Sequence, residues 1–223
     1  MAVVARLAAE DYLADIYRLQ AEGETATTGS VAGLRRVRPA STTSMFKRLA
    51  RDGLVTYSAY EGVALTEEGQ RLALAVLRRH RLVERFLTDV LRLPWEAVDD
   101  LADEMEHGLP EAVVDALEAL LGNPFTCPHG YPIPDKEGHL VQAPLRRLAD
   151  LHGGEAGLVA RVDERVPGLL AYVEEAGLVP GSAVRVESHN PVDDTVAVRV
   201  GGALRVIGPR VAQAVSVEPA ETR

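Results

Sequence analysis

The hydrophobic periodicity of this chain changes once, at a segment rich in proline and glycine, and this change constrains the fold most. Before it, apolar residues such as Leu13, Ile16 and Tyr17 recur at the spacing of amphipathic helices. The segment itself, GNPFTCPHGYPIPDKEG, holds four prolines and three glycines among 17 residues, which predicts a linker or an extended loop. After it, valine-rich stretches such as TVAVRV alternate as strands do. The sequence therefore predicts a helical part followed by a small β-barrel.

Composition narrows the class of protein. Of the 223 residues, 47% are hydrophobic, so the chain can bury a sizeable core and is not expected to be disordered. No apolar run approaches the length of a membrane span, and acids interrupt the region where a signal peptide would be apolar. The single cysteine, Cys127, excludes an intramolecular disulfide and fits a reducing compartment. We therefore expect a cytoplasmic protein.

The helical part reads as a series of elements separated by turns. Ser41 is a plausible N-cap for the third helix, which ends at the glycine of DGL. Strand-type residues on either side of Glu61 and Gly62 predict a β-hairpin. The helices are expected at about 4–21, 29–36, 41–52, 67–91, 94–108 and 110–121. One more helix, PGLLAYVEEAG, is expected within the barrel.

Residues 30–51 concentrate positive charge in a chain whose net charge is -9. The segment has six Lys and Arg residues and no acid, and its second helix opens with small polar residues. A recognition helix presents such residues to base edges and phosphates, and the hairpin at 55–64 would be its wing. A solvated helix pair is the alternative interpretation. The candidate DNA contacts are Arg35, Arg36, Arg38, Ser41, Thr42, Thr43, Ser44, Lys47, Arg48 and Arg51.

A second constellation is acidic and contains histidine. In DEMEHGLP, residues 103–110, helical spacing places Asp103, Glu106 and His107 on one face. Further candidates on other helical segments are Asp11, His80, Glu84 and Asp99. Carboxylates and imidazoles suit a divalent first-row metal, and a set without sulfur favours the harder ions. Each residue alone fits a solvated helix edge, so only the combination predicts a metal site.

Two enzyme motifs come close to this pattern, and neither fits. The H-x-x-E-H motif has Asp103 in place of its first histidine. The Glu-x-x-His motif of di-metal bundles occurs once, at Glu104 and His107, without a second copy. Cys127 lies in the proline-rich segment, and no serine has a nucleophile-elbow context. We therefore expect no enzyme, with a metalloenzyme or metal carrier bearing an incidental winged helix as the alternative.

With these motifs, the chain resembles the diphtheria toxin repressor family of metal-dependent transcriptional regulators, particularly its manganese transport regulator branch. The resemblance covers almost the whole chain. It rests on EDYLADIYRL, STTSMFKRLARDGLV, YEGVALTEEGQRLA, RRHRLVERFL, DEMEHGLP and CPHGYPIP. It implies a mainly helical protein with β structure. The implied domains are a winged helix-turn-helix at 1–74, a helical metal-binding and dimerisation domain at 75–143, and an SH3-like barrel at 144–223.

The resemblance also implies two metal sites. The family's ligands fall on Asp11, Asp103, Glu106 and His107 for one site, and on His80 and Glu84 for the other. This sequence has Ala14 where two-domain manganese regulators have a glutamate, and Asp99 where iron regulators have a second-site histidine. The barrel ligands of iron regulators have no clear match near Val166 and Leu169, although Glu164 is nearby. His129 is expected to be structural.

The predicted function follows from these sites. Iron-responsive members tend to have methionine at the position of Asp11, so Mn(II) is the expected metal and Fe(II) the alternative. Metal would tie the DNA-binding part to the dimerisation part, so that the protein represses metal-uptake genes as a homodimer on a palindromic double-stranded operator. No membrane partner is expected. The predicted dimer seam consists of Leu101, Met105, Leu109, Val113 and Leu117.

Overall fold

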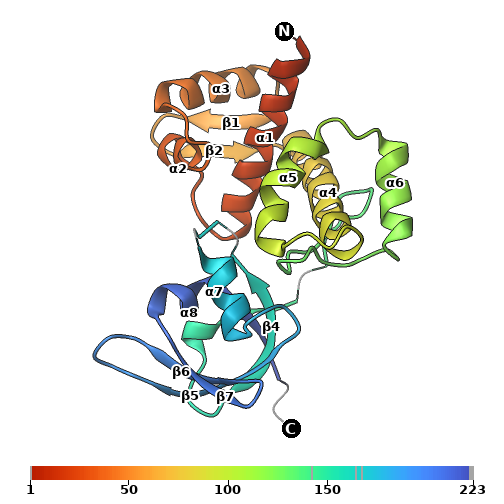
Figure 1. The fold of residues 1–223 in the computed structure, drawn as a ribbon. Coiled ribbons are helices and arrows are strands. Elements are labelled where there is room, and N and C mark those ends of the chain that lie inside the picture. Colours follow the sequence, from red (N-terminus) through yellow and green to blue (C-terminus); the bar gives the residue numbers. More distant parts are fainter. Residues whose placement is uncertain (1, 142, 164, 167, 221–223) are drawn as a thin grey trace. The chain divides into compact units, whose positions relative to one another are not determined.

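A computed structural model describes residues 2–141, 143–163, 165–166 and 168–220. Glu164, considered above as a barrel ligand, lies outside the described residues. The chain forms two compact units, drawn together in Figure 1. Unit 1 comprises residues 1–80, 105–110 and 134–140, and unit 2 comprises 81–104, 111–133 and 141–223. The mainly helical class with a C-terminal β part is confirmed, whereas the three domain boundaries stay a prediction.

Unit 1 contains the predicted winged helix-turn-helix (Figure 1). Its elements are α1 (Ala2–Ala21), α2 (Thr28–Leu34), α3 (Pro39–Arg51), β1 (Val55–Ser58), β2 (Gly62–Leu65) and the first part of α4 (Glu67–Asp89). Phe46 of α3 is fully buried and meets Tyr12 of α1 edge-on, with ring centroids 6.3 Å apart. Tyr57 of β1 packs on Phe46 at 5.3 Å. These apolar contacts hold α3 against α1.

The hairpin and the start of α3 each depend on one residue with restricted backbone geometry. Gly62 has φ 94°, and a Cβ there would lie 2.5 Å from the Ala26 carbonyl oxygen, so only glycine fits this turn. Pro39 occupies the first turn of α3, with Arg38 as its N-cap. The predicted N-cap role of Ser41 is therefore wrong, because proline starts the helix earlier with a preset φ.

Unit 2 combines the remaining helices with the valine-rich strands (Figure 1). Its helical elements are the end of α4, the 3-10 turn Trp95–Ala97, most of α5 (Val98–Glu106), and α6 (Glu111–Leu120). The strands are β3 (Arg146–Arg147), β4 (Ala156–Val162), β5 (Ala183–His189), β6 (Val196–Val200), β7 (Ala203–Ile207) and β8 (Val215–Pro219). They form one antiparallel sheet in the order β3-β8-β4-β5-β6-β7.

One helix, α7 (Leu169–Ala176), lies within the β part as predicted, and a shorter one, α8 (Pro209–Ala214), was not predicted. Alternating strand residues such as Val184, Val186 and Val198 fill the core, which Trp95 joins from the helical side. The indole nitrogen of Trp95 donates to Glu174 of α7 at 3.2 Å. The helical and β parts of unit 2 therefore share a packed core.

The proline-rich segment is a packed loop in its first half. The His129 carbonyl accepts from the Val162 N–H of β4 at 2.9 Å. A Cβ at Gly130 would lie 1.9 Å from the Ala160 carbonyl oxygen, so the loop requires glycine to approach the strand this closely. The guanidinium carbon of Arg161 lies 4.9 Å from the ring centroid of Tyr131. Of the alternatives left by the sequence, the extended loop is correct for this half. None of the described helices is long and apolar enough to cross a membrane.

Candidate metal centre and DNA-binding face

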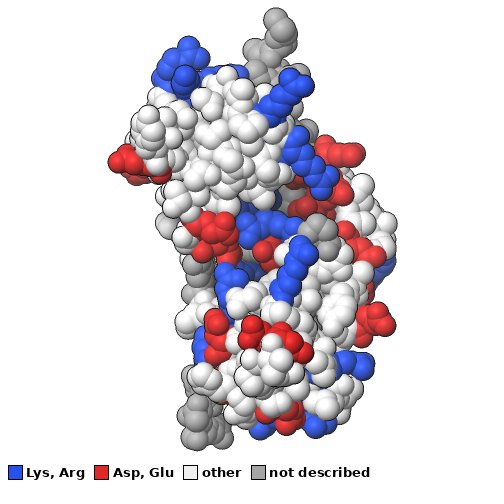
Figure 2. Space-filling model, turned by 90° about the vertical axis from the view of Figure 1, so that its left-hand side faces the viewer, with Lys and Arg blue, Asp and Glu red and all other residues white. Residues whose placement is uncertain are grey.

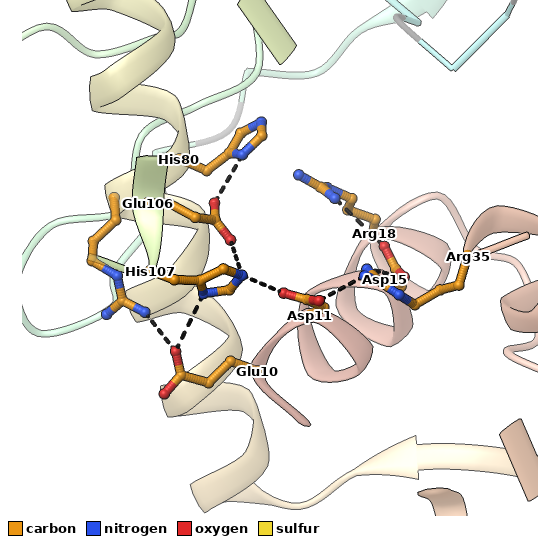
Figure 3. A network of polar contacts seen from close by, with 9 residues as sticks. Glu10, Asp11, Asp15, Arg18, Arg35, His80, Glu106 and His107 are labelled. Carbon is orange, nitrogen blue, oxygen red and sulfur yellow. Dashed lines mark hydrogen bonds and ion pairs between the residues drawn. The ribbon is translucent and has the colours of Figure 1, made fainter. Parts of the chain in front are cut away.

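Four of the predicted metal ligands meet in unit 1, and we call Asp11, His80, Glu106 and His107 the open cluster (Figure 3). Nε2 of His107 lies 2.7 Å from Oδ1 of Asp11 and 3.5 Å from Oε1 of Glu106. Nδ1 of His80 lies 2.9 Å from Oε2 of Glu106. The four residues come from α1, α4 and the end of α5, so three segments distant in sequence converge here.

The open cluster is partly exposed to solvent. His80 and Glu106 are buried, whereas the side chains of Asp11 and His107 are 17% and 18% exposed. One ligand atom from each of Asp11, Glu106 and His107 falls within 4.8 Å of the other two, close enough to surround one ion. Two carboxylates and an imidazole suit Mn²⁺, Fe²⁺ or Co²⁺, so the donor set fits a divalent first-row metal.

Charged residues outside the open cluster contact two of its members, His107 and Asp11 (Figure 3). Glu10 lies 3.9 Å from Nδ1 of His107 through Oε2, and the same oxygen accepts from Arg79 at 2.9 Å. On the other side, Arg35 donates to Oδ2 of Asp11 at 2.6 Å. Such partners fix the orientation of a ligand before metal arrives.

The other predicted ligands lie on α4 and α5. Asp103 is exposed on α5, one turn before Glu106, so the helix carries both carboxylates on one face. Asp99 is half-buried one turn earlier still. Glu84 is buried one turn after His80 on α4. The structure pairs His80 with Glu106, whereas the resemblance assigned these two residues to different sites.

Glu84 belongs to a buried group in unit 2, and we call Glu84, Cys127 and His129 the closed cluster. Oε1 of Glu84 lies 2.9 Å from Nδ1 of His129, and Nε2 of His129 lies 2.9 Å from the Trp95 carbonyl oxygen. Exposure is 1% for Glu84, 2% for Cys127 and 0% for His129. Burial alone would lower the pKa of His129, but contacts with Cys127 and Glu84 and their negative charge raise it to about 12.

The closed cluster offers one oxygen, one nitrogen and one sulfur ligand within 4.8 Å of one another, so it also has the makings of a metal site. A metal can bind there only if the protonated His129 gives up its proton. Sequence reasoning left Cys127 and His129 out of the metal set. The signal for them was the Cys-x-His spacing in the loop, although nothing in the sequence connects it to Glu84.

The predicted DNA contacts divide into two groups on unit 1. Exposed residues of α3 lie opposite its buried residues, so the helix has one polar face. That face, with the preceding turn, carries Arg36, Arg38, Ser41, Ser44, Lys47 and Arg51, with Thr43 and Arg48 partly buried. Lys and Arg side chains gather at the upper end of the face drawn in Figure 2.

Two of the predicted DNA contacts lie elsewhere. Thr42 is 0% exposed, and its hydroxyl lies 3.4 Å from that of Tyr12, so its predicted role facing bases is wrong. The helical period turns this position toward α1 although the residue is polar. The Arg35 side chain binds Asp11 and Asp15 instead of extending along α3.

Comparison with protein families identifies three regions. Residues 7–63 match the iron dependent repressor N-terminal DNA-binding domain. Residues 66–135 match the iron dependent repressor metal-binding and dimerisation domain, and residues 146–219 match the FeoA domain.

Whole proteins of known function match as well. The iron-dependent repressor IdeR of Mycobacterium tuberculosis (strain ATCC 25618 / H37Rv) is 38% identical over 191 residues, covering 80% of this chain and 83% of that protein. The IdeR of Mycobacterium leprae (strain TN) is 34% identical over 221 residues, covering 94% and 96%. A solved manganese-dependent transcriptional repressor in complex with manganese superposes with a TM-score of 0.87 and 32% identity, covering 95% of this chain and all of that chain.

Proposed function

Because this chain belongs to the DtxR/IdeR family of metal-dependent transcriptional repressors, we propose that Mn(II) is the metal to which it responds. The family is one of DNA-binding repressors and not of enzymes. The observation that carries the choice of Mn(II) is the open cluster, in which the ligand atoms of Asp11, Glu106 and His107 are oxygen and nitrogen without sulfur. The manganese-bound structural relative supports the same choice.

The ligand set we propose is Asp11, Asp103, Glu106 and His107. His80 contacts Glu106 and would orient its carboxylate. Bound metal supplies positive charge that offsets the repulsion between the carboxylates. The protein's own residues supply the geometry: α1 brings Asp11 and α5 brings Glu106 next to His107. Since α1 also packs on the recognition helix through Tyr12 and Phe46, a change at Asp11 acts on the DNA-binding face.

We propose that the active form is a homodimer bound to a palindromic operator in the cytoplasm. Support comes from apolar residues that remain partly exposed on α5, on α6 and between them, within the matched dimerisation region. These are Leu101, Met105, Leu109, Val113 and Leu117. A two-fold symmetric dimer reads the two half-sites of a two-fold symmetric operator.

Fe(II) is the second candidate metal, favoured by the identity with the two IdeR proteins. The deciding experiment is anaerobic measurement of DNA affinity while Mn²⁺ or Fe²⁺ is titrated into the metal-free protein. Operator DNA is selected from random sequence in parallel with the Mn²⁺-loaded and the Fe²⁺-loaded protein. Activation by Mn²⁺ at micromolar concentration supports the proposal. Activation by Fe²⁺ alone would assign the chain to iron, and DNA affinity indifferent to both ions would refute metal control.

A further inference from the structure

The Arg35 side chain connects the open cluster with the DNA-binding helices. Arg35 directly follows α2, four residues before α3 begins at Pro39. One of its terminal nitrogens lies 2.6 Å from Oδ2 of Asp11, and the other lies 3.3 Å from Oδ2 of Asp15 (Figure 3). Its guanidinium carbon lies 5.7 Å from the ring centroid of Tyr12. The side chain is thus held on α1 by two carboxylates and a ring.

The two oxygens of Asp11 have different partners. Oδ1 faces Nε2 of His107 at 2.7 Å, within the open cluster, whereas Oδ2 is taken by Arg35. A metal that binds Oδ1 therefore need not displace the guanidinium. The planar fork of an arginine suits this task, because it can hold Asp11 and Asp15 at once and fix the plane of the carboxylate.

We propose that Arg35 is a positioning residue: it holds Oδ2 of Asp11 so that Oδ1 points toward Glu106 and His107, and it links this ligand to the turn that leads into α3. The inference rests on the proposed function, because it takes the open cluster as the metal site. The turn is short, because only residues 35–38 separate α2 from α3, so little slack separates Arg35 from the recognition helix. Metal that fixes Asp11 then also restrains that turn.

Two other roles for Arg35 make different predictions. As a phosphate contact, which the sequence alone suggested, Arg35 would affect DNA binding equally with and without metal. As a staple between α2 and α1, it would affect folding stability but not metal affinity. A positioning residue changes metal affinity measured without DNA, and it changes how much the metal improves DNA affinity.

The test compares Arg35→Lys with Arg38→Lys in the full-length protein. Lysine keeps the positive charge, so repulsion between residue 35 and the metal is retained while the fork that bridges two carboxylates is lost. Arg38 is the matched control because it is an exposed arginine of the same turn, and the structure records no contact between it and Asp11 or Asp15. For each variant we would measure thermal unfolding without metal, the Mn²⁺ dissociation constant without DNA, and DNA affinity with and without Mn²⁺.

For Arg35→Lys we expect Mn²⁺ binding to weaken about tenfold and the metal-dependent gain in DNA affinity to fall about fivefold, while the metal-free protein unfolds near the wild-type temperature. Arg38→Lys should keep the wild-type Mn²⁺ affinity measured without DNA. Asp15→Asn removes the other anchor of Arg35 but leaves its contact with Asp11, so its effect on Mn²⁺ affinity should be smaller than that of Arg35→Lys.

Wild-type Mn²⁺ affinity in Arg35→Lys would overturn the proposal. Equal losses of Mn²⁺ affinity in Arg35→Lys and Asp15→Asn would also overturn it, because the contact of Arg35 with Asp11 would then have no special part in metal binding. If wild-type DNA affinity did not respond to Mn²⁺ at all, the proposed function would fail. The Mn²⁺ affinities measured without DNA would then still decide whether Arg35 positions Asp11.

Discussion

The open and closed clusters use similar side chains in opposite surroundings. Each sets carboxylate against histidine, with pairs at 2.7 Å in the open cluster and 2.9 Å in the closed cluster. The closed cluster is sealed from solvent and carries its own counter-charge, the proton that stays on His129 because its pKa is about 12. Two members of the open cluster reach solvent, and arginines from other segments bind its edges.

This difference in burial leads us to expect different roles for the two clusters. An ion entering the open cluster replaces contacts at a surface that solvent can reach. An ion entering the closed cluster must first expel a proton and open a packed loop. We therefore expect metal to be sensed at the open cluster and the closed cluster to contribute mainly to folding stability at neutral pH.

Removal of His107 is expected to have the largest effect on function. His107→Ala should abolish the metal-dependent gain in DNA affinity, which in coupled systems is of the order of 5- to 150-fold. Weak DNA binding without metal should persist, since the exposed face of α3 is unchanged. The control is His139→Ala, because His139 is an exposed imidazole paired with Asp135. A full metal response in His107→Ala, measured by fluorescence anisotropy of labelled DNA, would show that the open cluster is not the sensor.

The closed cluster should respond with stability instead. His129→Gln keeps a polar side chain but cannot carry the charge that balances Glu84. Breaking a buried ion pair in this way should lower the free energy of unfolding by about 3 kcal/mol. Urea denaturation of the metal-free protein measures this loss, with His139→Gln as the exposed control. A loss equal to that of the control would mean that the pair is not stabilising.

The same pair predicts a pH dependence. The folded state raises the pKa of His129 from 6.5 to about 12, so the folded protein holds a proton that the unfolded chain releases above pH 6.5. Its stabilisation is complete below about pH 6.5 and declines as pH rises toward 12. The stability difference between wild type and His129→Gln should therefore shrink between pH 7 and pH 10. A constant difference, measured by urea denaturation at each pH, would refute the assignment.

Metal preference is expected to change at the open cluster with a single ligand. Asp11→Met replaces a hard oxygen with a thioether, which should shift activation from Mn²⁺ toward Fe²⁺ or Co²⁺. The readout is the ratio of metal concentrations that give half-maximal DNA binding, measured anaerobically. Leu7→Met on the same helix controls for an added thioether elsewhere. An unchanged ratio would mean that Asp11 does not contribute to selectivity.

The sequence predicts these two clusters unequally for a physical reason. Asp103, Glu106 and His107 share one helix, so their common face follows from helical spacing. His80 and Glu106 are 26 positions apart in the sequence, and Glu84 and His129 are 45 apart. Helical or strand spacing therefore predicts neither contact. Amphipathic helices and alternating strands revealed most of the fold, whereas the packed loop depends on how Gly130 meets β4. Local periods predict elements, and tertiary packing decides which elements meet.

The smallest effect is expected from a substitution on the DNA-binding face, outside both clusters. Lys47 is exposed on α3, and the structure gives it no contact with residues of either cluster. If one phosphate contact is lost, DNA binding releases one fewer counterion. Lys47→Ala should therefore reduce the steepness of the log-log plot of DNA affinity against salt concentration by about 1. Arg205→Ala removes a charge from an exposed position on β7 and serves as the control.

The loss of DNA affinity in Lys47→Ala is expected to be independent of metal. A phosphate contact strengthens DNA binding whether or not the open cluster is filled, so the affinity of Lys47→Ala should fall by the same factor with and without Mn²⁺. The metal-dependent gain would then stay at its wild-type value, in contrast to its disappearance in His107→Ala. If the gain itself fell in Lys47→Ala, the recognition helix would take part in metal sensing. The DNA-binding face and the open cluster would then not have separate roles.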